Sequence, residues 1–202
     1  MLIQQDLLEI FDFVEPSDAN AGTFSHRIHA LMMRTCMEIE ANFKAILSAN
    51  GHAVRQTTMR EYKKLEKTHR LSSYEIILPT WQGEGKVRRP FAKWPCSLPW
   101  YQAYNDAKHN RHDRFSAANL QNLVDSVCGL VAILGSQFYT CDFSPKADIV
   151  FVGESGLPEG HEVAIGGYFI VHFPSDWPEE DRYDFDWNDL SQKKSPFDNL
   201  VL

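Results

Sequence analysis

The sequence of 202 residues predicts a mainly α-helical protein with a small β-rich segment near its C-terminal end. Two long stretches, 24–49 and 120–138, repeat apolar residues at the 3.6-residue period of a helix that buries one face. After Cys141 the pattern changes to β-branched and aromatic runs separated by Gly and Pro, which is typical of strands and turns. We therefore expect a helical domain over 1–141 and a β-rich, acidic appendage over 142–202, with a β-hairpin or extended strands, packed on it.

The N-terminal quarter of the chain predicts a short docking segment followed by a long helix. Residues 1–22 combine an apolar patch with a loop of small and polar residues. The helix over 24–49 is expected to begin after Thr23 or Ser25, because a hydroxyl side chain can accept a hydrogen bond from a free N–H group of the first turn. It is expected to end at Asn50, which precedes a glycine suited to a helix C-terminus.

The middle of the chain contains shorter elements and a long connection. Thr58 and Glu61 have the spacing of a capping box, which predicts a second helix through about Lys67. Residues 74–78 are typical of an extended segment. The stretch 79–99 holds too many Gly and Pro residues for regular structure. Its aromatic side chains nevertheless indicate a packed loop: Trp81, Phe91 and Trp94.

The second half predicts two helices and then strands. Pro99 suits the first position of a helix, where its missing N–H has no cost. A long helix should follow over 120–138. Residues 148–152 and 162–173 have the composition of strands, and the acidic, aromatic segment 177–187 is expected to wrap back onto the body.

Charge is unevenly distributed along this acidic chain. The net charge of −7 argues against a protein that coats nucleic acid without specificity. Residues 86–93 and 108–114 are nevertheless basic, whereas 176–189 are strongly acidic. A local anion-binding site on an acidic protein is therefore compatible with the sequence.

The composition also indicates the cellular compartment and whether a cofactor or metal is expected. No apolar run approaches the roughly 18 residues that span a bilayer, and the first residues lack the layout of a signal peptide, so we expect a cytoplasmic protein without membrane contact. Cys36 and Cys128 lie in apolar periodic segments and are expected to be reduced and buried. The wide cysteine spacing disfavours zinc, and Gly-rich phosphate loops, nucleophile elbows and His-Glu-x-x-His are absent, so no cofactor or metal is expected.

The main candidate site lies in the segment that follows Pro99. On one continuous helix, Asn105, Lys108, His109 and His112 would share a face, and Arg111 would lie beside it. Imidazoles can exchange protons near neutral pH, and the basic groups can hold phosphate oxygens. The alternative is a solvated helix end where neighbouring aspartates pair with the basic residues.

Other polar pairs give weaker indications of chemistry. His26 and His29 resemble half of a metal site, but no obvious carboxylate or cysteine partner accompanies them. Arg34 and Glu38 lie four residues apart and predict a surface ion pair, or alternatively residues that orient the candidate site from a neighbouring helix. The acidic residues from Asp181 onward lack the glycine and terminal glutamate of a calcium loop.

Two segments together resemble the HEPN superfamily of α-helical domains, found in prokaryotic toxins, phage-defence proteins and RNA-processing factors. They are Arg34-Thr-Cys-Met-Glu-Ile-Glu-Ala-Asn-Phe-Lys44 and Tyr104-Asn-Asp-Ala-Lys-His-Asn-Arg111, followed by a final apolar helix. The resemblance covers about 24–139 and implies a helical bundle. Active members are metal-independent ribonucleases that typically dimerise, bringing two copies of an Arg-to-His motif into one cleft.

Carried over to this chain, the resemblance makes His109 the catalytic histidine and places Asn105 near the motif's Arg and polar residue. No Arg precedes a His at the required interval, and Lys108 or Arg111 would have to supply the guanidinium's role. Two hypotheses follow. The one we favour is a HEPN-like module, expected to be a homodimer, that binds RNA, a nucleotide or a protein partner through the basic face. The alternative is a ribonuclease of the toxin or phage-defence type that uses His109 as acid or base.

Overall fold

The computed structural model describes residues 2–52, 58–94, 96–139, 157, 159–163, 166–178 and 192. Over these residues the protein is mainly helical with a small antiparallel sheet, which confirms the predicted fold class at that level. The helices are α1 (Leu2–Phe11), α2 (His26–Ala49), α3 (Met59–Tyr62), α4 (Glu66–His69), α5 (Pro99–His109), α6 (Arg111–Arg114) and α7 (Leu120–Phe138). The strands are β1 (Glu75–Ile77), β2 (Val87–Arg88), β3 (His161–Val163) and β4 (Ile170–His172).

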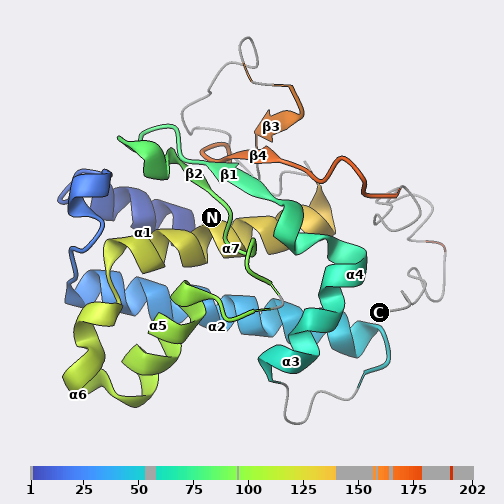
Figure 1. Ribbon diagram of the computed structural model, residues 1–202, viewed down its shortest axis with the longest axis horizontal. Coiled ribbons are helices and arrows are strands. Elements are labelled where there is room, and N and C mark those ends of the chain that lie inside the picture. Colours follow the sequence, from blue (N-terminus) through green and yellow to red (C-terminus); the bar gives the residue numbers. More distant parts are fainter. Residues whose placement is uncertain are drawn as a thin grey trace.

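Helix α7 is the centre of the fold. It lies between α2 on one side and the sheet on the other, as Figure 1 shows. Two glycines of α7 permit close contacts with α5 and with Phe173, the residue after β4. A Cβ at Gly129 would lie 3.3 Å from the indole of Trp100, and one at Gly135 would lie 3.4 Å from the ring of Phe173. A helix that packs on both sides has apolar residues almost all round its circumference, which explains why the sequence of α7 predicts a buried helix so clearly.

The long helix α2 forms as the sequence predicts. Ser25 is its N-cap, and the hydroxyl of this residue accepts a hydrogen bond from the backbone N–H of Ile28, 3.2 Å away. The helix ends at Asn50, and Gly51 follows with φ +79°, the left-handed conformation that glycine adopts without strain. The predicted docking segment is α1, whose buried residues Leu7 and Ile10 pack toward α2.

The segment after Thr58 differs from the expected single helix. Thr58 precedes α3, but its side chain makes no capping hydrogen bond, and Glu61 instead forms an ion pair with Lys64 at 2.8 Å. A 3₁₀ turn over Lys63–Leu65 separates α3 from α4. The capping box predicted the start of the helix correctly and its continuity wrongly: the segment proceeds as short turns, in which Tyr62 and Leu65 are buried.

The sheet joins two distant parts of the chain. Its strand order is β2-β1-β4-β3, and every pair is antiparallel. Ile76 of β1 is opposite Arg88 on one side and Val171 of β4 on the other. The predicted strand at 74–78 is thus confirmed, and the C-terminal strands extend a sheet that the middle of the chain begins.

The connection 79–99 is more ordered than its Gly and Pro content predicted. It contains a 3₁₀ turn over Glu84–Lys86 and strand β2, so the expectation of no regular structure was wrong there. Its aromatic anchors are buried, as expected. The carboxylate of Asp18 holds the turn, because it accepts hydrogen bonds from the indole N–H of Trp81 at 2.8 Å and from the backbone N–H of Gly85 at 3.1 Å. This contact across 60-odd residues was not visible in the sequence.

Some predicted features lie outside the described residues. These are the strand at 148–152, most of the acidic segment and Cys141. Trp177, at the start of that segment, is described and buried, and its indole N–H donates to the carbonyl oxygen of Thr68 at 3.0 Å. Of the described helices, none is both long enough and apolar enough to cross a membrane.

Candidate functional site

Helix α5 carries the first part of the predicted site. Pro99 occupies its first turn, as expected, and its buried residues Trp100, Ala103, Tyr104 and Ala107 pack on α2 and α7. Tyr101 fixes α5 to α2, since its hydroxyl donates to a carboxylate oxygen of Glu40 at 2.9 Å. The opposite side of α5 and its C-terminal end are therefore presented to solvent.

The continuous basic helix face that the spacing predicted does not form. Helix α5 ends at His109, and Asn110 adopts φ −131° and ψ 50°, outside the helical region. The four-residue helix α6 begins at Arg111 and carries His112 in a new direction. Asparagine is a weak helix former that often occupies helix ends, which accounts for a break here. Asn105, Lys108 and His109 thus share α5, whereas Arg111 and His112 belong to α6.

Lys108 is exposed but not free. Its ammonium group donates a hydrogen bond to the hydroxyl of Tyr104 at 3.1 Å and lies 5.0 Å from the centre of that ring. The hydrogen bond with Tyr104 is the largest cause that raises the pKa of Lys108. Lys108 therefore remains charged and is directed back along α5, which weakens the expectation that it replaces a missing guanidinium.

The remaining predicted residues differ in exposure. His109, Arg111 and His112 are exposed, and Asn105 is half-buried. The last turn of α5 and α6 together present these basic groups at one end of the helix pair. There the negative end of the α5 dipole also stabilises positive charge. The sequence thus identified an accessible basic surface, although it assigned the wrong backbone to half of it.

An aromatic centre that sequence reasoning missed lies beside these residues. The ring of Phe115, in the 3₁₀ turn after α6, lies 4.9 Å from the imidazole of His26 and 5.2 Å from that of His29. The guanidinium of Arg111 lies 5.7 Å from the same ring, and Phe24 contacts it edge-on at 6.0 Å. We call these five residues the Phe115 cluster. Aromatic residues adjacent to His and Arg near positions 24 and 115 were the only sequence signal for it.

The cluster explains the two histidines near the start of α2. His26 is exposed, whereas His29 is half-buried and stacks on Phe115. Burial lowers the pKa of His29, and the positive charges of Arg111 and His26 lower it further against the opposing effect of the Ala107 carbonyl. No group of three or more His, Cys, Asp or Glu residues in the described part of the chain could hold a metal ion.

Arg34 and Glu38 do not take part in this site. Arg34 forms an ion pair with Asp6 of α1, rather than with Glu38. Both side chains line a different cavity, which α1 and α7 also border. The two expectations for this pair, an ion pair with each other and an orienting role toward α5, were therefore wrong. Spacing along one helix could not reveal that α1 supplies a competing carboxylate.

No protein-family model, curated protein or solved structure matches this chain.

Proposed function

We propose that the protein is a HEPN-like helical module that binds single-stranded RNA through the exposed surface of α6, the end of α5 and the Phe115 cluster. The observation that carries this proposal is the contact of Phe115 with two imidazoles and the Arg111 guanidinium, beside the half-exposed ring of Phe24. Basic groups next to accessible rings are the combination that single strands require.

Each part of this surface supplies a different interaction. Arg111 and the exposed His112 can contact phosphate oxygens, which gives affinity without sequence readout. Phe24, with 51% of its surface exposed, offers a ring on which a base can stack. Because the chain has a net charge of −7, such binding is confined to a local surface and should depend strongly on salt.

Phe24 is held in place before any ligand arrives. It forms a β-bridge with Asn119, and the backbone N–H of Leu120 donates to the carbonyl oxygen of Thr23 at 2.8 Å. The backbone that carries the ring is therefore already positioned, which lowers the conformational entropy lost on binding. RNA is preferred over a protein partner because this exposed ring lies against Phe115, which in turn contacts the Arg111 guanidinium.

The test is fluorescence anisotropy with a labelled 12-nucleotide RNA that carries a 5′-hydroxyl, in chelator and at low salt. Arg111→Ala and Phe24→Ala should each weaken binding about tenfold or more. The matched controls are Arg60→Ala on α3 and Phe13→Ala, because both residues are exposed and neither belongs to this surface. The oligomeric state is measured by light scattering in the same buffer, because the resemblance implies a homodimer.

Two results would contradict the proposal: no saturable binding by the wild-type protein, or equal weakening by Arg60→Ala and Arg111→Ala. The same reactions are analysed on a gel for cleavage. Cleavage that ends in a cyclic phosphate and is lost in His109→Ala would replace the binding module by the ribonuclease, with His109 as acid or base.

A further inference from the structure

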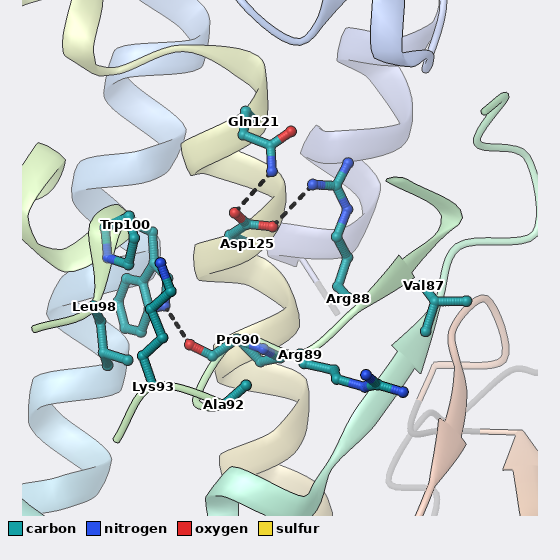
Figure 2. A pocket seen from close by; sticks show the side chains of 11 residues that line it. Val87, Arg88, Arg89, Pro90, Ala92, Lys93, Leu98, Trp100, Gln121 and Asp125 are labelled. Carbon is teal, nitrogen blue, oxygen red and sulfur yellow. Dashed lines mark hydrogen bonds and ion pairs between the residues drawn. The ribbon is translucent and has the colours of Figure 1, made fainter. Parts of the chain in front are cut away.

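A cavity of about 280 Å³ lies at the other end of α5, between α7 and the chain that leads from β2 into α5. Figure 2 shows its lining, with Lys93 and Trp100 on one side and the Arg88–Asp125 pair on the other. Its volume is near the lower limit of pockets that hold small molecules. The basic segment that the sequence showed at 86–93 therefore borders a concave site rather than the α6 surface.

The charges around this cavity favour an anion, although the chain is acidic. Three basic residues line it, Arg88, Arg89 and Lys93, against a single carboxylate, that of Asp125. Both oxygens of that carboxylate are engaged, one by Arg88 at 3.1 Å and the other by the side-chain amide of Gln121 at 3.0 Å. The carboxylate of Asp125 should therefore repel a bound anion only weakly.

The positive charges are less completely neutralised. Arg88 is 5% exposed, and its Nε and Nη2 atoms have no hydrogen-bond partner in the described part of the chain. Lys93 is exposed and forms no ion pair with any described residue. Arg89 is paired with Glu75, which lies outside the cavity. Because Arg88 is paired with Asp125 and Arg89 with Glu75, the uncompensated positive charge of the lining is that of Lys93.

The start of α5 adds to this potential. Its N-cap, Leu98, has no side chain able to accept a hydrogen bond, and Leu98, Pro99 and Trp100 all line the cavity. Pro99 has no N–H, and the N–H groups of Tyr101 and Gln102 donate to the Leu98 carbonyl oxygen. The Trp100 N–H and the positive end of the helix dipole are therefore left for an external acceptor. Apolar atoms of Pro90, Leu98 and Trp100 complete the wall, so the site suits an anion attached to an organic group.

We propose that this cavity binds a phosphate monoester, with Lys93 and the start of α5 on the phosphate and the apolar wall against the attached group. A phosphate monoester carries a charge of about −1.5 to −2 and three acceptor oxygens, more than a carboxylate offers to the same donors. The phosphate can come from a free nucleotide or from the 5′ end of an RNA strand. This site is independent of the α6 surface, because the 11 residues of α5 separate the two ends by about 15 Å.

Calorimetry with adenosine 5′-monophosphate and with inorganic phosphate tests the site, with adenosine and acetate as matched ligands. Both phosphates should bind saturably, and adenosine and acetate at least about tenfold more weakly. Lys93→Glu should weaken phosphate binding at least about tenfold. Lys86→Glu is the control, since Lys86 is exposed nearby but does not line the cavity. Thermal unfolding of each variant checks that these surface changes leave the fold intact.

The proposal falls if adenosine 5′-monophosphate binds no better than adenosine, or if Lys86→Glu weakens binding as much as Lys93→Glu. The source of the phosphate is read from the 12-nucleotide RNA with and without a 5′-phosphate. Tighter binding of the phosphorylated strand, removed by Lys93→Glu, assigns the site to RNA ends; equal binding of both strands assigns it to free phosphates. The 5′-hydroxyl strand should bind Lys93→Glu as it binds wild type, so failure here leaves the RNA proposal untouched.

Discussion

The guanidinium of Arg88, almost completely buried, donates a hydrogen bond to the Asp125 carboxylate across 3.1 Å and joins strand β2 to the central helix α7. The guanidinium also lies over the indole of Trp81, with the Arg88 Cζ atom 4.4 Å from the ring centre. This pair ties the sheet and the 79–99 connection to the helical core. Breaking one partner leaves the other charge buried without compensation.

We predict that Arg88→Met lowers the free energy of unfolding by about 3–5 kcal/mol, the range for an uncompensated buried charge. Asp125→Leu should also destabilise. The double variant Arg88→Met/Asp125→Leu should be less destabilised than the sum of the two by at least about 1 kcal/mol, because neither charge is then orphaned. Urea unfolding at pH 7 measures all three. Additive effects would show that the two residues act independently.

His69 makes stability dependent on pH. This imidazole is buried in α4, and burial lowers its pKa to about 4 in the folded protein, from about 6.5 in the unfolded chain. A lowered folded-state pKa contributes stability that is complete above pH 6.5 and is lost as the pH falls toward 4. The free energy of unfolding should therefore drop by about 2 kcal/mol between pH 7.5 and pH 5 through this residue.

Unfolding of wild type and His69→Gln in urea at both pH values measures that contribution as the difference between their pH dependences. The control is His109→Gln, which changes an exposed imidazole. An identical pH dependence in wild type and His69→Gln would exclude His69 as its origin.

Gly83 should tolerate no side chain. Its φ of +109° is a conformation that other residues rarely adopt, and a Cβ there would lie 2.2 Å from a carboxylate oxygen of Asp18. Gly83→Ala should cost about 1–3 kcal/mol of unfolding free energy, since both the strain and the displaced Asp18 act against the fold. Gly22→Ala is the control, because a Cβ at Gly22 has open space around it. Equal unfolding free energies for these two variants would contradict the close approach of Asp18.

The cysteines should differ sharply in reactivity. Cys36 and Cys128 are buried, and burial raises the pKa of both thiols far above the usual range, whereas Cys96 is exposed. Brief alkylation with iodoacetamide at pH 8 in native buffer, followed by peptide mapping, should modify Cys96 and leave Cys36 and Cys128 unmodified. In urea all three should react. Native modification of Cys128 at the rate of Cys96 would show that α7 is not packed as described.

The sequence predicted the long helices well because each carries a periodic apolar stripe and terminal signals. Ser25 and Asn50 bound α2, and Pro99 starts α5. It predicted the interior of 79–99 and the continuity of the segment after Thr58 less well. Short elements of this kind are held by groups distant in sequence, as Asp18 accepts hydrogen bonds from Trp81 and Gly85. Local helix and strand propensity cannot predict such partners.

The candidate site divides in the same way. The residues 105–112 by themselves determined that a compact group of basic and amide side chains would lie at a helix end, since spacing and composition are local properties. Only the tertiary structure decided that the helix breaks at Asn110 and that Lys108 turns to Tyr104. It also decided which elements contact each other. Phe115 packs against His26 and His29 of α2, and Arg34 pairs with Asp6 of α1 instead of with Glu38. Such partners are chosen by packing between elements far apart in the chain, where burial and charge compensation outweigh local preference.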